Sequence, residues 1–211
     1  MNSKTFTLSL IRNPGRILNA LKRKLLKLET YEGKACITQF EIETLQYYAK
    51  RATRGIIEIG VLDAGTTREM GLVAHVPIYG IDPLIPDSMD SNLHGSIDIV
   101  KNNMKFYTQF HFFNDYSYNV VKTWDNAFDF IFIDGDHRYD AVKQDFEDWY
   151  PLLSDNGFVA FHDAAPVTSD PHNPHQGYEG PIRLVEELGS FDGLKYIGSY
   201  DSLVVFQKNS S

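Results

Sequence analysis

Two Asp- and His-rich segments offer the clearest chemistry in this sequence, because each directly follows an apolar run. The runs cover residues 128–133 and 157–161. The ionisable side chains at their ends are Asp134, Asp136, His137, His162 and Asp163. Carboxylates and imidazoles gathered in one cleft can bind a divalent cation or move a proton near neutral pH. We therefore expect metal-assisted or acid–base chemistry where the two segments meet.

Each of these side chains also has a structural explanation. Asp134 or Asp136 could cap a helix expected to begin near Arg138. His162 could be a buried histidine with its hydrogen bonds satisfied below the site, and His137 could be a solvated helix-start residue. As general base we favour His137 over Asp136, because a neutral imidazole suits proton removal near pH 7.

A glycine-containing turn earlier in the chain could hold a ligand through its backbone. Gly60 ends a β-branched run, and Gly65 follows just before Thr66 and Thr67. Two glycines let the backbone turn tightly and approach a ligand, and the next helix would direct its first N–H groups there. The spacing differs from the G-x-G-x-x-G of nicotinamide and flavin binding, which weighs against a dinucleotide oxidoreductase.

Two acids accompany this turn. Asp82 closes the next apolar run, about 20 residues on, where a carboxylate can accept both hydroxyls of a ribose. Glu58 lies inside the buried run before Gly60, where a charge is costly unless a cation or hydrogen-bond donors meet it. Glu58 is therefore either a ligand-facing acid or a strand carboxylate with structural partners.

Helical and extended patterns alternate along the chain and would bring these motifs together. Strands are expected over residues 55–60, 76–82, 110–113, 128–133, 157–161, 194–199 and 203–207. Helices are expected over residues 40–51, 66–74, 96–105, 117–124, 138–153 and 182–188. This alternation predicts a Rossmann-like, doubly wound α/β fold with a mostly parallel seven-stranded sheet and helices on both faces. Ligands bind such sheets outside the carboxyl ends of the strands.

Two segments need separate mention. In the helix over residues 138–153, one face would carry Val142, Phe146, Trp149, Tyr150 and Leu153. Residues 164–180 form a long irregular stretch with three prolines, His172, His175 and Tyr178. Loops of this length in compact domains are usually functional or mobile.

The N-terminal part differs from the rest of the chain in charge. Residues 1–30 carry seven Lys or Arg and one acid, although the whole chain has a net charge of −8. Residues 1–37 are thus expected to be a basic appendage with an amphipathic helix, and residues 38–211 the main domain. We expect the helix to pack on its own domain or form a homodimer contact, with peripheral binding to an anionic membrane as the alternative.

Composition narrows the function classes further. The acidic body argues against nucleic acid as a partner. No apolar run reaches the length of a membrane span, and no secretory leader is evident. Cys36 is the single cysteine, which is typical of a reducing cytoplasm.

The glycine turn and its acids resemble those of class I S-adenosylmethionine-dependent methyltransferases, over about residues 38–207. The resemblance implies S-adenosylmethionine as cofactor, with Gly60 and Gly65 along its methionine part and Asp82 on its ribose. The segment Asp115-Tyr116-Ser117 matches the adenine-contacting segment, which implicates Ser117. The remaining cofactor contacts implied are Glu58, Thr66, Thr67 and Asp134.

The Asp-Gly-Asp-His segment resembles a methyltransferase group that includes small-molecule and sugar O-methyltransferases and proteins labelled cephalosporin hydroxylase. It also resembles metal-dependent catechol and caffeoyl-coenzyme A O-methyltransferases. Their metal ligands match Asp134, His162 and Asp163, with His162 replacing an Asp and Asp163 an Asn. Their catalytic Lys matches His137, whereas in the antibiotic-sugar branch the base matches Asp136. The histidine replacements imply either a metal softer than Mg²⁺ or no metal.

The sequence thus predicts O-methylation of a small-molecule or sugar hydroxyl by S-adenosylmethionine, either with a divalent metal, Mg²⁺ or a transition metal, or without one. Two alternatives stay open at this stage. One is a nicotinamide-dependent oxidoreductase, and the other is a non-catalytic binding protein on the methyltransferase fold.

Overall fold

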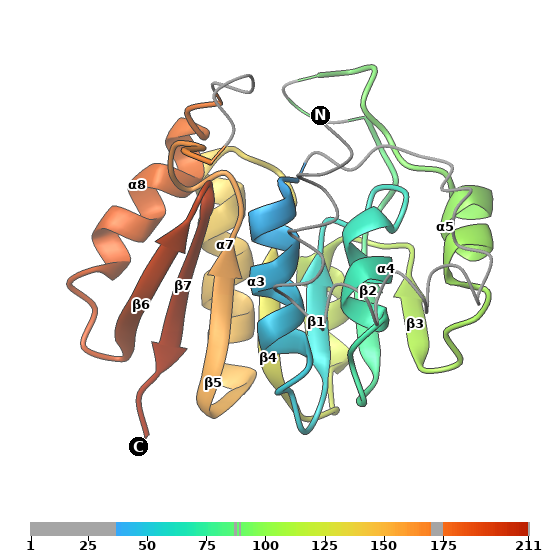
Figure 1. Ribbon diagram of the computed structural model, residues 1–211, viewed down its shortest axis with the longest axis horizontal. Helices are drawn as coiled ribbons and strands as arrows, with labels where there is room; N and C mark the ends of the chain where they lie inside the picture. Colours follow the sequence, from blue (N-terminus) through green and yellow to red (C-terminus); the bar gives the residue numbers. More distant parts are fainter. Residues whose placement is uncertain (1–36, 87, 89, 170–174, 211) are drawn as a thin grey trace, which may run out of the picture.

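Seven strands form one sheet in the order β3-β2-β1-β4-β5-β7-β6 (Figure 1). The computed structural model describes residues 37–86, 88, 90–169 and 175–210. The strands are β1 (Ile56–Ile59), β2 (Ile78–Ile81), β3 (Phe110–Phe113), β4 (Phe128–Ile133), β5 (Leu153–Phe161), β6 (Leu194–Tyr200) and β7 (Leu203–Lys208). Strand β7 runs antiparallel to both of its neighbours, β5 and β6, and all other strand pairs are parallel. The predicted Rossmann-like, mostly parallel seven-stranded sheet is confirmed.

Helices cover both faces of this sheet. The α-helices are α3 (Gln39–Ala49), α4 (Gly65–Gly71), α5 (Ile97–Met104), α6 (Ser117–Val120), α7 (Tyr139–Trp149) and α8 (Glu179–Leu188). Two 3₁₀ turns, η1 (Val121–Thr123) and η2 (Tyr150–Leu152), follow α6 and α7. No helix among the described residues is long and apolar enough to cross a membrane.

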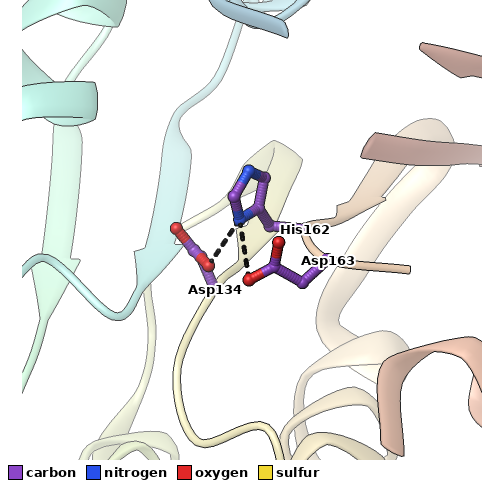
Figure 2. A group of neighbouring side chains, drawn as sticks. All are labelled: Asp134, His162 and Asp163. Atoms are coloured by element: carbon purple, nitrogen blue, oxygen red, sulfur yellow. Dashed lines mark hydrogen bonds and ion pairs between the residues drawn. The ribbon is translucent and has the colours of Figure 1, made fainter. Parts of the chain in front are cut away.

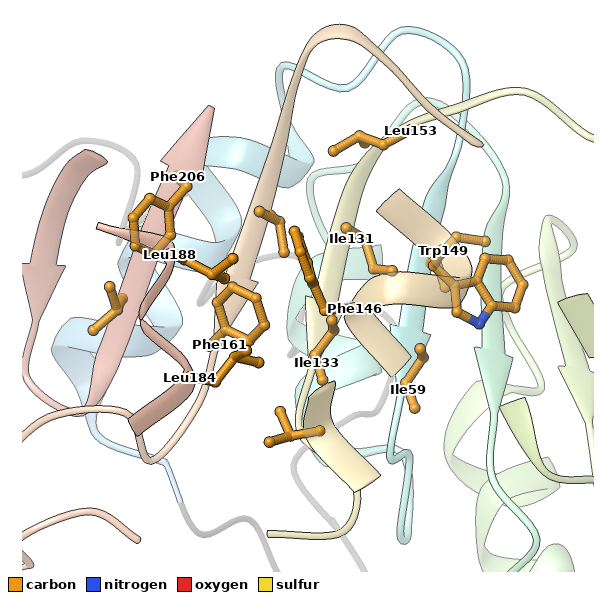
Figure 3. Close-up of a cluster of buried hydrophobic side chains, with 14 of the residues drawn as sticks. Ile59, Ile131, Ile133, Phe146, Trp149, Leu153, Phe161, Leu184, Leu188 and Phe206 are labelled. Atoms are coloured by element: carbon orange, nitrogen blue, oxygen red, sulfur yellow. The ribbon is translucent and has the colours of Figure 1, made fainter. Parts of the chain in front are cut away.

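Two main apolar cores hold the layers together. On one face, α7 and α8 pack Phe146, Trp149 and Leu184 against β4, β5 and β7 (Figure 3). On the other face, α3 and α4 pack Leu45 and Met70 against the opposite side of the sheet. Each large apolar side chain buried in this way contributes about 1.5–3 kcal/mol of transfer free energy. These cores fix the strand ends, where the polar residues lie.

The predicted helices over residues 117–124 and 138–153 show the largest differences from the structure at their ends. The helix predicted over residues 138–153 stops at Trp149, because Pro151 lacks the N–H that would continue it. Leu153 was predicted on its apolar face, which is wrong: this residue begins β5, although it is buried in the same core. The helix predicted over residues 117–124 is α-helical only to Val120 and then tightens into η1.

The predicted N-terminal appendage, with its basic helix, lies outside the described residues except for Ile37. The same holds for His172 in the stretch after β5. The described residues of the stretch after β5 lie on the carboxyl side of the sheet, where the Val167 N–H donates to the His175 carbonyl at 2.9 Å.

Candidate active site

A cavity of about 470 Å³ opens at the carboxyl ends of the parallel strands. Every residue predicted for the site lines it except Glu58 and Thr67. Those lining it are Gly60, Gly65, Thr66, Asp82, Ser117, Asp134, Asp136, His137, His162 and Asp163. The cavity lies at the switch point of the sheet, between β1 and β4. Its volume falls in the range of about 300–1,000 Å³ that is typical of small-molecule sites.

The tip of β1 approaches the tip of β4 very closely at Gly60. Its φ of +88° lies in the region that favours glycine. A Cβ added there would lie 2.0 Å from the Asp134 carbonyl oxygen, and the Asp134 N–H donates to the Ile59 carbonyl at 2.8 Å. Only glycine therefore lets the turn lie against the strand that carries Asp134.

Asp82, at the end of β2, organises the turn after β1. Its Oδ2 accepts the N–H groups of Val61 and Leu62, both at 2.8 Å, and its Oδ1 accepts the Leu84 N–H at 2.6 Å. Burial raises the pKa of the Asp82 carboxyl, although these amides oppose the shift. The sequence did not predict this backbone role. Because each carboxylate oxygen has two lone pairs, Oδ1 still has one for a ligand hydroxyl.

Glu58 and Thr67 lie behind the cavity wall, and both side chains are fully buried. Burial raises the pKa of the Glu58 carboxyl well above its usual range, and the nearby Asp134 and Asp82 add to this rise. The Thr67 hydroxyl counteracts it. Within the described residues neither Glu58 oxygen completes a hydrogen bond of normal geometry, but the Thr67 hydroxyl lies close enough to act on the carboxyl. The structural explanation for Glu58 therefore has one partial partner.

Three imidazoles converge on Asp163 at the end of β5. His175 Nε2 lies 2.8 Å from Oδ1, while His137 Nε2 and His162 Nδ1 lie 3.0 and 3.4 Å from Oδ2. Burial disfavours the charged carboxylate, but the facing imidazoles of His137 and His162 outweigh it and lower the pKa of Asp163. The His137 ring packs on Tyr178 with 4.3 Å between centroids.

His162 is buried among three carboxylates, and Figure 2 shows two of them, Asp134 and Asp163. Its Nδ1 lies 3.0 Å from Asp134 Oδ1 and 3.4 Å from Asp163 Oδ2, and its Nε2 lies 3.6 Å from Glu41 Oε2. Burial alone would lower the pKa of His162, but Asp134, Asp163 and Glu41 together raise it well above its usual range. The predicted structural explanation for His162 therefore has partners in this structure.

The predicted metal set, Asp134, His162 and Asp163, is brought together at this point. Each residue offers one ligand atom, and these atoms all lie within 4.8 Å of one another. Two carboxylates and one imidazole suit a divalent metal of intermediate softness. Glu41 faces the other nitrogen of His162, as outer carboxylates do for metal-bound histidines. The donor set thus fits a divalent ion.

Asp136, the second candidate base, is already engaged. Its carboxylate accepts hydrogen bonds from the Arg138 side chain at 2.6–3.1 Å, from the Arg138 N–H at 2.9 Å and from the Ser88 hydroxyl at 2.9 Å. Burial opposes its charge, but the Arg138 contacts outweigh this and lower the pKa of Asp136. Helix α7 begins after Arg138 without a side-chain cap, so Asp136 is not its N-cap.

Several residues near the cavity were not predicted as site residues. They are Glu41, Asp145, His175 and Tyr178. Glu41 sits in a Thr38 capping box at the start of α3, a pattern that suggests only a helix start. Asp145 had a sequence signal, since it interrupts the apolar face between Val142 and Phe146. His175 and Tyr178 belong to the long stretch after β5, whose contacts no local pattern fixes.

A family model described as a methyltransferase domain matches residues 19–164. The chain belongs to this methyltransferase family. The match begins inside the predicted appendage of residues 1–37, and the boundary at residue 38 stays a prediction. The chain is also 29% identical over 158 residues to the uncharacterized protein R132 of Acanthamoeba polyphaga mimivirus, which spans 70% of this chain and 68% of that protein.

Solved structures show the same fold in known methyltransferases. A putative caffeoyl-CoA O-methyltransferase from Staphylococcus aureus matches with a TM-score of 0.66 and 18% identity, covering 98% of each chain. The O-methyltransferase from Bacillus cereus in complex with SAH matches with a TM-score of 0.60 and 16% identity, covering 92% of this chain and 90% of that one.

The chain is thus a methyltransferase by family, on the seven-stranded fold that these solved methyltransferases share. The nicotinamide-dependent alternative and the non-catalytic alternative are thereby set aside. The roles of individual residues, the methyl acceptor and the metal belong to the next subsection.

Proposed function

We propose that this methyltransferase transfers a methyl group from S-adenosylmethionine to a hydroxyl of a small molecule or sugar, with His137 as general base. The observation that carries this proposal is the contact of 3.0 Å between His137 Nε2 and Asp163 Oδ2 at the wall of the cavity. A base held by a carboxylate is oriented and stabilised in its protonated form. Asp136 is less suited to act as the base, because its carboxylate is already paired with the Arg138 guanidinium.

Cofactor binding follows from the turn between β1 and α4. The bound cofactor supplies an electrophilic methyl group on a sulfonium. Gly60 and Gly65 line the proposed methionine part, and Asp82 offers its remaining lone pair to a ribose hydroxyl. Thr66 and Ser117 also line the cavity, whereas Glu58 and Thr67 would act from behind the wall.

The acceptor hydroxyl would enter beside His137 and Tyr178. The His137 side chain is only 14% exposed and packs against the Tyr178 ring, so a substrate there would meet a site with little water. His137 would take the hydroxyl proton at one ring nitrogen as the oxygen bonds to the methyl carbon and the carbon–sulfur bond breaks to leave a neutral thioether. Asp163 would stabilise the resulting imidazolium. Positioning of the hydroxyl in line with the methyl group supplies much of the rate.

A divalent metal is the second part of the proposal. Asp134, His162 and Asp163 would hold it, with Glu41 orienting His162 and His175 orienting Asp163. When bound, such an ion lowers the pKa of the acceptor hydroxyl and orients it. The imidazole ligand favours a transition metal over Mg²⁺.

Partners and location stay predictions. The single cysteine favours the reducing cytoplasm. The acidic body argues against nucleic acid, and a homodimer or membrane contact would involve the N-terminal region outside the described residues.

The proposal is tested by incubating the enzyme with methyl-labelled S-adenosylmethionine and a panel of catechols, other phenols and sugars. Product fragmentation by mass spectrometry then locates the label. We expect methylation on oxygen, lost in the His137→Ala variant and kept in Glu147→Gln, an exposed change on α7. Label on nitrogen or carbon, or full activity in His137→Ala, would contradict the proposal.

A further inference from the structure

Asp145 is a buried acid of the cavity that the mechanism above does not use. It lies on α7, is 8% exposed and lines the cavity. Its Oδ1 accepts a short hydrogen bond from the Ser117 hydroxyl at the start of α6. The charges acting on it include two further acids, Asp136 and Asp148. A carboxylate in such a place is costly unless a ligand brings it a donor.

The second carboxylate oxygen of Asp145 points to the tip of β4. A Cβ added at Gly135 would lie 3.6 Å from Asp145 Oδ2, so the missing side chain at Gly135 leaves space beside this oxygen. Gly135 lines the cavity too. Oδ2 is thus an acceptor with room for a small group beside it, whereas Oδ1 is committed to Ser117.

The position of Asp145 along the cavity indicates which part of a ligand meets it. Asp82 follows β2, and Ser117, at the start of the helix α6 that follows β3, lines the same cavity. If Asp82 holds the ribose and the β1 turn holds the methionine part, the base of the nucleoside extends toward Ser117. Adenine carries an exocyclic amine whose N–H groups are donors. This step rests on the proposed cofactor orientation.

We propose that Asp145, oriented by Ser117, accepts a hydrogen bond from the exocyclic amine of adenine and selects a 6-aminopurine cofactor. Hydrogen bonds to charged groups are worth enough to change affinity roughly ten- to a hundredfold. Ser117 then acts partly through Asp145 as a positioning residue. A purine without the amine would leave the buried carboxylate without its donor.

A double-mutant cycle between protein and ligand tests this assignment. S-adenosylhomocysteine and its purine analogue, which lacks only the 6-amino group, are titrated by calorimetry into wild type, Asp145→Asn and Glu147→Gln. In wild type and in Glu147→Gln we expect loss of the amine to weaken binding at least tenfold. In Asp145→Asn, loss of the amine should weaken binding by about threefold or less.

The ratio of the dissociation constants of the two ligands is measured within each protein, so a modest loss of stability in Asp145→Asn does not affect it. Equal penalties in wild type and Asp145→Asn would overturn the assignment. So would a wild type that binds both ligands equally well, and this measurement needs no folded variant. A wild type that binds neither ligand overturns the methyl-donor assignment and the role of Asp145 with it.

Discussion

At the scale of single residues, two aspartates close to His137, Asp163 in space and Asp136 in sequence, have different partners. Asp163 faces His137 Nε2 at 3.0 Å. Asp136, directly before His137 in sequence, is turned toward Arg138 with an Nη2–Oδ2 distance of 2.6 Å. The sequence predicted the residue types of this site and their gathering at strand ends. It could not predict which acid faces which base, because this depends on side-chain direction after the strands end.

Replacement of His137 by Ala should lower kcat roughly 10²- to 10⁴-fold, the usual contribution of a general base. Affinity for S-adenosylhomocysteine, measured by calorimetry, should change little. Asp136→Asn should lower kcat less, because the Asp136 carboxylate accepts hydrogen bonds from Arg138 and Ser88. A crippling Asp136→Asn change combined with a mild His137→Ala change would reverse the two roles.

Asp145 should leave a signature in the pH dependence of stability. Burial raises the pKa of its carboxyl to about 7, against the opposing hydrogen bond from Ser117, and an unfolded Asp titrates near 3.9. Between these values the folded state binds the extra proton, so the free energy of unfolding should fall as pH rises from about 4 to 7. At about 1.36 kcal/mol per pKa unit, the change is on the order of a few kcal/mol.

Urea unfolding of the ligand-free protein at several pH values measures this effect. Asp145→Asn should flatten the slope between pH 4 and 7, since an amide does not titrate, whereas Glu147→Gln should keep it. The same slope in wild type and Asp145→Asn would show that the Asp145 carboxyl is not shifted.

At the scale of elements, the site depends on how the tips of β1 and β4 meet. Gly60, directly after β1, lies against the carbonyl of Asp134, directly after β4. Asp82, directly after β2, holds the backbone that follows Gly60. Strand periodicity and the glycine turn were enough to predict these elements. The closeness of the two tips was not predictable, because it depends on the parallel register of Ile59 with Ile133.

Gly60→Ala should therefore abolish detectable binding of S-adenosylhomocysteine. The new Cβ would lie 2.0 Å from the Asp134 carbonyl oxygen, and the φ of +88° is unfavourable for alanine. Stability should fall by about 1–3 kcal/mol or more, as for other overpacked sites. Gly189→Ala is the matched control: Gly189 ends α8 with a φ of −58°. Wild-type affinity in Gly60→Ala would contradict the proposed path of the cofactor.

The end of α7 shows why element boundaries were harder to predict than element types. Apolar spacing suggested one helix through Leu153, and in the structure Leu153 is indeed buried with Phe146 and Trp149. Burial alone does not distinguish a helix from a strand when both pack into one core. Pro151 was the signal that mattered, and it ends the helix at Trp149.

At the scale of the whole molecule, segments far apart in sequence meet in one polar cluster. Glu41 comes from α3, Asp134 from the end of β4 and His175 from the stretch after β5. The strand tips were predictable, because parallel strands end on one edge. Glu41 and His175 were not, because their contacts depend on how α3 and the long stretch pack over that edge.

The metal proposal gives a prediction about the whole enzyme. Dialysis against a chelator should lower methyl transfer strongly, and a first-row transition metal should restore it better than Mg²⁺. Metal content measured by mass spectrometry should fall in His162→Ala and stay unchanged in Glu147→Gln. Full activity in excess chelator would indicate that the buried imidazole of His162 serves this site without a metal.

The most direct test of the central claim is a pair of calorimetric titrations of the wild-type protein, one with S-adenosylhomocysteine and one with NAD. The strand order, the turn from Gly60 to Gly65 and Asp82 at the end of β2 all indicate a methyltransferase cofactor site. We predict saturable binding of one S-adenosylhomocysteine per chain and no measurable binding of NAD. Tight NAD binding, or no binding of S-adenosylhomocysteine by folded protein, would contradict the account.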